Sequence, residues 1–232
     1  MIYIENKKKS QKTLAKLYPN AEVIDVTSKG QEPFIRLSPF YPHGNIPVPF
    51  SENTHAYSVE GIWQGLKVFE MEDIDISKFE IKNMKGIKRT SRRFGKPIGH
   101  RKGVRGTEHL DYLTARKQIY LPSYAWVLQN KTQNEIDLLV SIAEKKDLVL
   151  LDYETNEDIE NIRKPISHAA LVKKYIYKKY PIISQKDFSE PEQTIKLILT
   201  NPRKGKDESS KRRSRAKKNK KKDDAGQLNL TM

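Results

Sequence analysis

The chain has 232 residues with 44 Lys and Arg, 29 Asp and Glu, a formal net charge of +15 and no cysteine. This length allows one domain with a sizeable core, and the lack of cysteine excludes disulfides and thiolate metal sites. No apolar run approaches the roughly 20 residues that span a bilayer, and the N-terminal stretch is too short for a signal peptide. We therefore expect a soluble cytoplasmic protein without a membrane, metal or cofactor site, whose basic surface favours nucleic acid as a partner.

Apolar and β-branched runs predict short strands, and apolar residues at helical spacing predict helices between them. The expected strands cover 2–5, 22–27, 34–37, 79–82 and 148–151. The expected helices cover 10–17, 58–69, 111–121, 134–145, 167–176 and 190–200. Helices outweigh strands, so we predict an α+β fold with one predominantly helical domain over 1–201 and a small sheet.

The densest chemistry lies in a loop rich in proline, glycine and aromatic rings, 39–50, and in the helix predicted after it. Ser58 is a suitable N-cap, because its side-chain oxygen can accept a hydrogen bond from a backbone N–H of the first turn. Glu60, Gln64 and Lys67 follow at spacings i, i+4 and i+7, which place them on one helix face. This face is either exposed to solvent or the wall of a pocket opposite the aromatic loop.

A basic, glycine-rich segment, 85–106, holds nine Lys and Arg and five Gly. Local signals predict a loop here, and loops of this length in compact domains are usually functional or disordered. Within it, 95–103 combines backbone N–H groups with cations, which suits phosphate or pyrophosphate. His100 is either a surface histidine or an acid–base group.

Four short motifs stand in order along this part of the chain: LSPFYP at 37–42, SVE at 58–60, WQ at 63–64 and KVF at 67–69. Together they resemble the core motif of the NADAR superfamily, in which an S-x-F-Y-P loop precedes a helix with Glu, Gln and Lys at these spacings. Gly61 stands where that family often has His, and Trp63 where it often has Tyr or Phe.

The resemblance continues downstream. Residues 110–130 resemble the family's D-W helix segment, with Tyr112 in place of Trp, and 148–158 resemble its acidic ending. Asp152 and Asp158 are both candidates for the acidic residue there, and the W-G-x-G that normally closes the motif is absent. The chain is thus identified as a divergent member.

NADAR proteins include N-glycosidases acting on riboflavin-pathway intermediates and enzymes that remove ADP-ribose from guanine in nucleic acid. The resemblance therefore implies an N-glycosidase-type hydrolase that acts on a ribosylated or ADP-ribosylated base. Glu60 would stabilise the oxocarbenium-like sugar carbon or activate water, as carboxylates do in glycoside hydrolysis, and Asp152 or Asp158 would be the second carboxylate. Lys67 would add to the sugar C1 as a nucleophile or bind phosphate. The expected substrate-binding residues are Tyr41 and Trp63 around the base, Arg101 and Lys102 at the diphosphate, and Gln64, His100 and Tyr112.

From Pro202 to the end, twelve Lys and Arg stand against four Asp and Glu, a net charge of +8. The stretch 202–225 is predicted to be disordered, because it has too little apolar surface to offset the entropy of ordering. The last residues, GQLNLTM at 226–232, resemble the peptide by which bacterial and phage proteins bind the replication sliding clamp.

The alternative to an enzyme is a nucleic-acid-binding accessory protein of phage or mobile-element origin, with a degenerate NADAR-like pocket. Its basic loop and tail would bind DNA or RNA in a salt-dependent manner.

Overall fold

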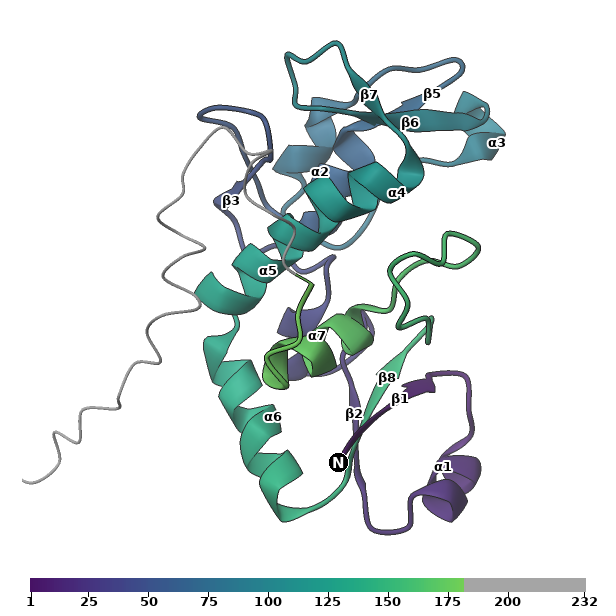
Figure 1. The fold of residues 1–232 in the computed structure, drawn as a ribbon, viewed down its shortest axis with the longest axis vertical. Coiled ribbons are helices and arrows are strands. Elements are labelled where there is room, and N and C mark those ends of the chain that lie inside the picture. Colours follow the sequence, from purple (N-terminus) through teal and green to yellow (C-terminus); the bar gives the residue numbers. More distant parts are fainter. Residues whose placement is uncertain (182–232) are drawn as a thin grey trace, which may run out of the picture. The chain divides into compact units, whose positions relative to one another are not determined.

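The structure is a computed structural model that describes residues 1–181. These residues belong to one compact unit, Met1–Pro191, with a mixed α+β fold, as predicted (Figure 1). The helix predicted at 190–200, the basic tail 202–225 and the C-terminal peptide 226–232 lie outside the described residues. No helix within 1–181 is long and apolar enough to cross a membrane.

A three-stranded parallel sheet is formed by β1 (Ile2–Asn6), β8 (Leu148–Asp152) and β2 (Glu22–Asp25), in the order β1-β8-β2. The central strand is an apolar run whose first three residues are fully buried. This is the pattern of a strand covered on both faces. Because the three strands are parallel, their carboxyl ends lie at the same end of the sheet, where β8 ends in Asp152.

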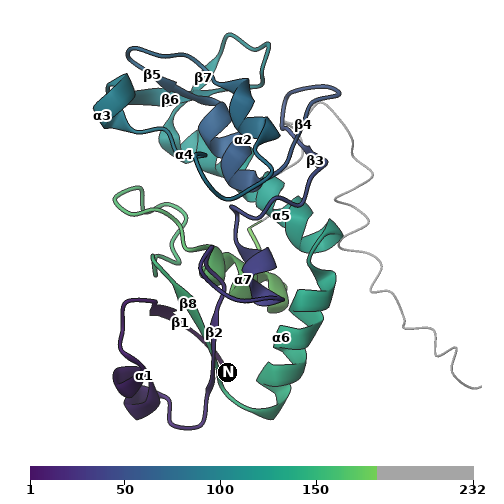
Figure 2. The ribbon, with the colours of Figure 1, turned by 180° about the vertical axis from the view of Figure 1, so that it is seen from behind.

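The remaining elements complete the domain. The short strands are β3 (Ile46–Pro47), β4 (His55–Ala56), β5 (Lys67–Phe69), β6 (Pro97–Arg101) and β7 (His109–Leu110). The helices are α1 (Gln11–Leu17), α2 (Val59–Gly65), α3 (Ser91–Phe94), α4 (Tyr112–Ala115), α5 (Leu121–Asn130), α6 (Gln133–Lys145) and α7 (His168–Ile176), with 3-10 turns η1 (Phe34–Leu37) and η2 (Ile76–Glu80). Figure 2 shows β3 and β4 beside α5 and α2, and the antiparallel sheet β5-β6-β7 beyond α2.

Serine side chains cap three helices, and each serine is the first residue of a range predicted to be helical. The hydroxyl oxygens of Ser10, Ser58 and Ser167 each accept a hydrogen bond from a backbone N–H in the first turn of α1, α2 and α7. Each cap satisfies a donor that the helix itself leaves without a partner. The starts of the predicted helices are therefore confirmed at these places.

Helices α4 and α5 are joined without a break by a π turn, η3 (Arg116–Tyr120) (Figure 1). Pro122 follows in the first turn of α5 and has no N–H to donate to the carbonyl group four residues earlier. The wider π turn is compatible with this missing hydrogen bond. Such turns are rare and frequent at functional sites, and this one packs against α2.

Two predicted strands are wrong, because 34–37 is the turn η1, and 79–82 begins in the last two residues of η2 and continues without regular structure. Both stretches are apolar enough for a strand, yet local features favour a turn. Pro33 precedes η1, and the Asp75 carboxylate accepts from the Ser77 backbone N–H at 3.1 Å at the start of η2. Within the part of the chain that the structure describes, neither stretch pairs with a strand.

The basic segment 85–106 is not one long loop, in contrast to the prediction. It contains α3 and β6, and β6 is the middle strand of β5-β6-β7. Strands on both sides supply the hydrogen bonds, which composition within the segment does not reveal.

Helix α2 ends at Gly65, earlier than predicted, and Lys67 is the first residue of β5. Two glycines let α2 pack closely on η2. A Cβ on Gly61 would lie 2.7 Å from the carbonyl oxygen of Lys78, and a Cβ on Gly65 would lie 2.3 Å from the Phe79 ring. The histidine that the NADAR motif often has at the position of Gly61 therefore does not fit here.

Candidate functional site

Glu60 lies in the first turn of α2 and is buried, with 8% of its surface exposed. Its backbone N–H donates to the carbonyl oxygen of Pro39 at 2.8 Å, so the loop at 37–42 sits directly on the start of the helix. Tyr124 of α5 also contacts this loop, because its hydroxyl donates to the Leu37 carbonyl oxygen at 2.6 Å. The loop is thus fixed both to the start of α2, which carries Glu60, and to α5.

An amide connects this carboxylate to an amine. Gln64 donates from Nε2 to Glu60 Oε1 at 2.8 Å, and its Oε1 accepts from Lys67 Nζ at 3.4 Å and from the Arg89 backbone N–H at 3.1 Å. The two donors fix the orientation of the amide, with its nitrogen toward the carboxylate. We call Glu60, Gln64 and Lys67 the Glu60 group. Because Glu60 and Gln64 are buried, this face is not a solvent-exposed stripe.

The Glu60 group has perturbed ionisation. Burial raises the pKa of Glu60, while the Gln64 hydrogen bond and the Lys67 charge oppose the rise. Burial lowers the pKa of Lys67; Glu60 opposes this shift, and the charges of Arg89 and Lys88 add to it. Opposite shifts in a neighbouring acid and amine bring both pKa values toward neutrality, as acid–base and nucleophilic chemistry require.

Arg89 attaches the basic segment to α2 and β5. Its guanidinium donates to the carbonyl oxygens of Lys67 at 2.5 Å and Asp73 at 2.6 Å, and it packs on the rings of Phe69 and Phe94. Since Arg89 is itself buried, this part of the segment stabilises the site and does not present a charge to a ligand.

His100 is buried and not on the surface, with 2% of its area exposed. Its ring stacks on Trp63 at 3.7 Å between centroids, and Trp63 also meets the edges of Tyr112 and Tyr120 at 5.7 Å each. Burial, together with the charge of Lys67, lowers the pKa of His100 to about 3. A neutral imidazole therefore lies in an aromatic cluster behind Lys67.

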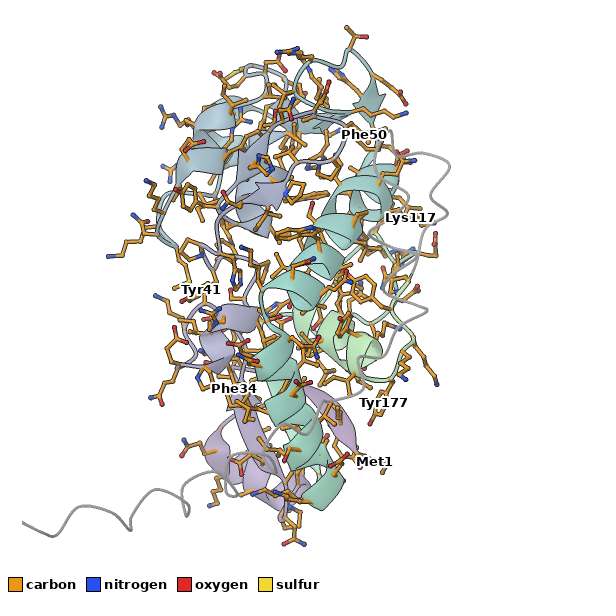
Figure 3. The ribbon with its side chains drawn as sticks, turned by 90° about the vertical axis from the view of Figure 1, so that its left-hand side faces the viewer. Met1, Phe34, Tyr41, Phe50, Lys117 and Tyr177 are labelled. Atoms are coloured by element: carbon orange, nitrogen blue, oxygen red, sulfur yellow. The ribbon has the colours of Figure 1, made fainter. Side chains whose placement is uncertain are left out.

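The other predicted binding residues are not gathered at the Glu60 group. Tyr41 lies near the surface (Figure 3) with its hydroxyl 3.4 Å from Arg36 Nη1, and among residues 1–181 its ring makes no contact with the Trp63 ring. Arg101 forms an ion pair with Asp73, and Lys102 with Glu108 at 3.0 Å. The predicted roles of Tyr41 at a base and of Arg101 and Lys102 at a diphosphate therefore stay predictions, and the structure pairs both cations with acidic residues. Tyr112 stacks on the guanidinium of Arg116 at 4.8 Å.

Asp152, at the carboxyl end of β8, forms a buried pair with His168 of α7. The Asp152 carboxylate lies 2.9 Å from His168 Nδ1, and it accepts from the Ser167 hydroxyl at 2.8 Å. The second ring nitrogen, His168 Nε2, lies 2.9 Å from the carbonyl oxygen of Val26. A carboxylate and a carbonyl group only accept, so both ring nitrogens carry protons and His168 is an imidazolium ion.

Each member of the pair shifts the pKa of the other. The pKa of Asp152 falls to about 2, because the His168 charge and hydrogen bonds outweigh the effect of burial. Conversely, the pKa of His168 rises, although burial alone would lower it. Asp158, the other candidate carboxylate, is exposed and accepts from the Glu160 N–H in a turn. Of the two, Asp152 has the defined charge partner.

Two hollows of about 410 and 340 Å³ adjoin beside the aromatic loop. The first is lined by Ser28, Lys29, Tyr41, Pro42, Asn83, Met84 and Lys85, and the second by Ser28, Phe40, Met84, Gly86, Ile87, Lys88 and Tyr153. Glu60 lines neither hollow, but the second is near it. Phe40 follows Pro39, whose carbonyl group contacts the Glu60 backbone, and the charge of Lys88 acts on Glu60.

A family model matches residues 6–172, that of the family of unknown function DUF6939. The match covers more than half of the chain. The chain belongs to this family. No curated protein and no solved structure matches it. The residues matched to DUF6939 include the Glu60 group, the two hollows and the Asp152–His168 pair. No cluster of His, Asp or Glu that could hold a metal ion is present in the part of the chain that the structure describes.

Several residues around the site were not predicted from the sequence. Lys88 lies in the basic segment and Phe40 in the LSPFYP motif, so both had a local signal. His168 and Tyr120 had none, because their positions depend on α7 and the π turn meeting elements distant in the chain. Burial raises the pKa of Tyr120, and the charge of Glu60 adds to that rise, so Tyr120 belongs to the surroundings of Glu60.

Proposed function

We propose that this protein is an N-glycosidase-type hydrolase that cleaves the bond between a base and a ribose or ADP-ribose. The observation that carries the proposal is the Glu60 group. A buried carboxylate and an amine of lowered pKa are joined through one amide whose orientation is fixed. The resemblance of the surrounding motifs to NADAR proteins supports the same reaction.

In such a reaction the C1–N bond breaks, its electron pair leaves with the base, and positive charge develops at C1. The Glu60 carboxylate would stabilise that charge and accept a proton from the water that attacks C1. The base would take up a proton as it leaves, so water is consumed and the free base and the sugar hemiacetal are formed. Gln64 would hold the carboxylate in position.

Lys67 offers a second route. Its lowered pKa increases the fraction of unprotonated amine, which could add to C1 as the C1–N bond to the base breaks and the base leaves with a proton. Cleavage of the bond between C1 and the ring oxygen would then give a protonated Schiff base, which water hydrolyses. Borohydride would reduce such an adduct and leave a covalent label on Lys67. If Lys67 only binds phosphate, no label would form during turnover.

The test is the release of free base or ADP-ribose from an oligonucleotide with ADP-ribosylated guanine, and from ribosylated nucleotides of low molecular mass. Glu60→Gln should abolish release while preserving the fold. Glu52→Gln, which changes an exposed glutamate to the same residue, should retain the wild-type rate. Release by Glu60→Gln at the wild-type rate would refute the role of Glu60, and no release from any substrate by the wild type would refute the proposal.

One observation favours the second candidate, a nucleic-acid-binding accessory protein. Glu60 is 8% exposed and lines neither hollow, as expected for a pocket that has lost its catalytic access. The sequence-based predictions of a DNA- or RNA-binding tail and of a sliding-clamp peptide concern residues outside those described. Binding of oligonucleotides without hydrolysis would support this candidate.

A further inference from the structure

We propose that Lys29, Lys85 and Lys88 form a binding site for the diphosphate group of a nucleotide. The site lies in the two adjoining hollows, which we call the lysine groove, and not at Arg101 and Lys102. It rests on the proposed function for the identity of the substrate, but nucleotide binding can be measured without any hydrolysis.

The lysine groove is continuous. Ser28 and Met84 line both hollows, so these two side chains lie where the hollows meet. Lys29 and Lys85 line the first hollow and Lys88 the second. Three ammonium groups are therefore distributed along one path beside the LSPFYP loop.

The charge of the lysine groove has one sign. Among the described residues, its lining contains three lysines and no Asp or Glu. Within 1–181, no ion pair involves Lys29, Lys85 or Lys88, whereas Arg101 and Lys102 each have an acidic partner. A diphosphate would gain charge-assisted hydrogen bonds from the three ammonium groups without first breaking an ion pair.

The remaining lining fits the other parts of a nucleotide. Phe40, Tyr41 and Tyr153 supply aromatic rings on which a base can stack, and the Lys88 ammonium lies 5.4 Å from the centroid of Phe40. Ser28 and Asn83 can hydrogen-bond ribose hydroxyl groups. A simple inorganic anion would contact the lysines alone, while a nucleotide would contact the lysines, the aromatic rings and the polar side chains.

The groove also has a direction. Lys88 precedes Arg89, whose backbone N–H donates to Gln64 Oε1 at 3.1 Å. The Lys88 ammonium group also lies 5.4 Å from the centroid of Phe40, which follows the Pro39 carbonyl group that accepts from the Glu60 N–H. The second hollow is therefore the end near the reacting sugar, and the first hollow would hold the distal nucleoside, with Tyr41 against its base. The diphosphate would then pass from Lys88 toward Lys85 and Lys29.

The experiment is titration of the full chain with ADP, adenosine and pyrophosphate, followed by calorimetry and by NMR of the methionine methyl groups. The chain has four methionines, and of the three that lie within residues 1–181 only Met84 lines the groove. ADP should shift the Met84 signal and leave that of Met71 unchanged. The triple variant Lys29→Gln, Lys85→Gln, Lys88→Gln should weaken ADP binding at least tenfold, and adenosine binding less than twofold.

Lys12→Gln with Lys16→Gln is the matched control, since both lysines are exposed on α1 and have no ion pair within 1–181. This control should bind ADP as the wild type does, and an unchanged melting temperature will show that each variant is folded. Glu60→Gln should also bind ADP normally, which separates this site from the catalytic proposal. Wild-type ADP affinity in the triple variant, or an ADP titration that leaves Met84 unchanged, would overturn the assignment.

Discussion

The buried pair Asp152–His168 allows a prediction with a calculable size. His168→Leu removes both ring N–H groups, leaving the Asp152 carboxylate without its counter-ion and the Val26 carbonyl without a donor. Loss of one partner from a buried ion pair costs about 3–5 kcal/mol. Asp152 still accepts from Ser167 and from the Tyr153 and Ala169 N–H groups, so we expect a loss near the lower limit, about 3 kcal/mol. For a domain of this size that corresponds to a melting temperature lower by roughly 6–12 °C.

The stabilisation should depend on pH in a defined direction. The pKa of His168 in the folded protein is raised above 6.5. The contribution of His168 to the free energy of unfolding is therefore fully present below pH 6.5 and is lost as the pH rises through the folded pKa. The folded pKa of Asp152, about 2, is below its ordinary 3.8, so that contribution is present above pH 3.8 and lost as the pH falls through about 2. The difference between wild type and variant should therefore be largest between about pH 4 and 6.5.

Urea unfolding from pH 4 to pH 9 measures this difference. His109→Leu, at an exposed histidine on β7, should stay within about 0.5 kcal/mol of the wild type. The double variant with Asp152→Asn should recover part of the loss, because no uncompensated charge remains. A cost below about 1 kcal/mol at pH 5.5, or a difference that does not shrink at alkaline pH, would refute the imidazolium assignment.

Three further predictions concern the packing and ionisation of the site. Gly61→Ala should destabilise the fold by about 1–3 kcal/mol in thermal unfolding, because the alanine Cβ would lie 2.7 Å from the Lys78 carbonyl oxygen. This clash should outweigh the helix propensity of alanine, and a higher melting temperature would contradict the prediction. Arg116→Lys should accelerate trypsin cleavage within 153–166. The buried guanidinium donates to three carbonyl groups of that loop, and an ammonium group cannot reach all three. An unchanged cleavage rate would argue that Arg116 does not fix this loop. Gln64→Leu should raise the pKa of Glu60 further, measured by carboxyl-carbon NMR, because it removes a hydrogen bond that lowers it, while Gln133→Leu on the exposed face of α6 should leave it unchanged.

Much of the parallel sheet and the helix caps could be predicted from the sequence, because these features have local signals. The run at 148–151 is apolar at successive positions, which indicates burial on both faces, and a serine before an amphipathic pattern marks a helix start. The elements that could not be predicted depend on distant partners. Strand β6 forms in a glycine- and lysine-rich stretch only because β5 and β7 lie on either side of it.

The Glu60 group shows how a site can be anticipated from a partly wrong secondary structure. The sequence predicts that Glu60, Gln64 and Lys67 are neighbours because all three lie on one helix. Instead α2 ends at Gly65 and Lys67 lies on β5, yet Lys67 Nζ still reaches Gln64 Oε1 at 3.4 Å. The chain turns immediately after the helix, so the spacing in sequence preserves the contact although the backbone differs.

The burial of Glu60 has two opposed consequences for any reaction at this site. It raises the pKa of the carboxylate, but it also means that Glu60 lines neither hollow. Burial changes along the segment that lines both hollows, since Ile87 and Arg89 are buried whereas Lys85 and Gly86 are exposed. A nucleotide in the proposed lysine groove would contact this exposed part directly. The same segment continues to Arg89, whose backbone N–H donates to Gln64 Oε1 at 3.1 Å, so we expect diphosphate binding to act on the Glu60 group through this backbone, as binding energy from remote parts of a substrate can do.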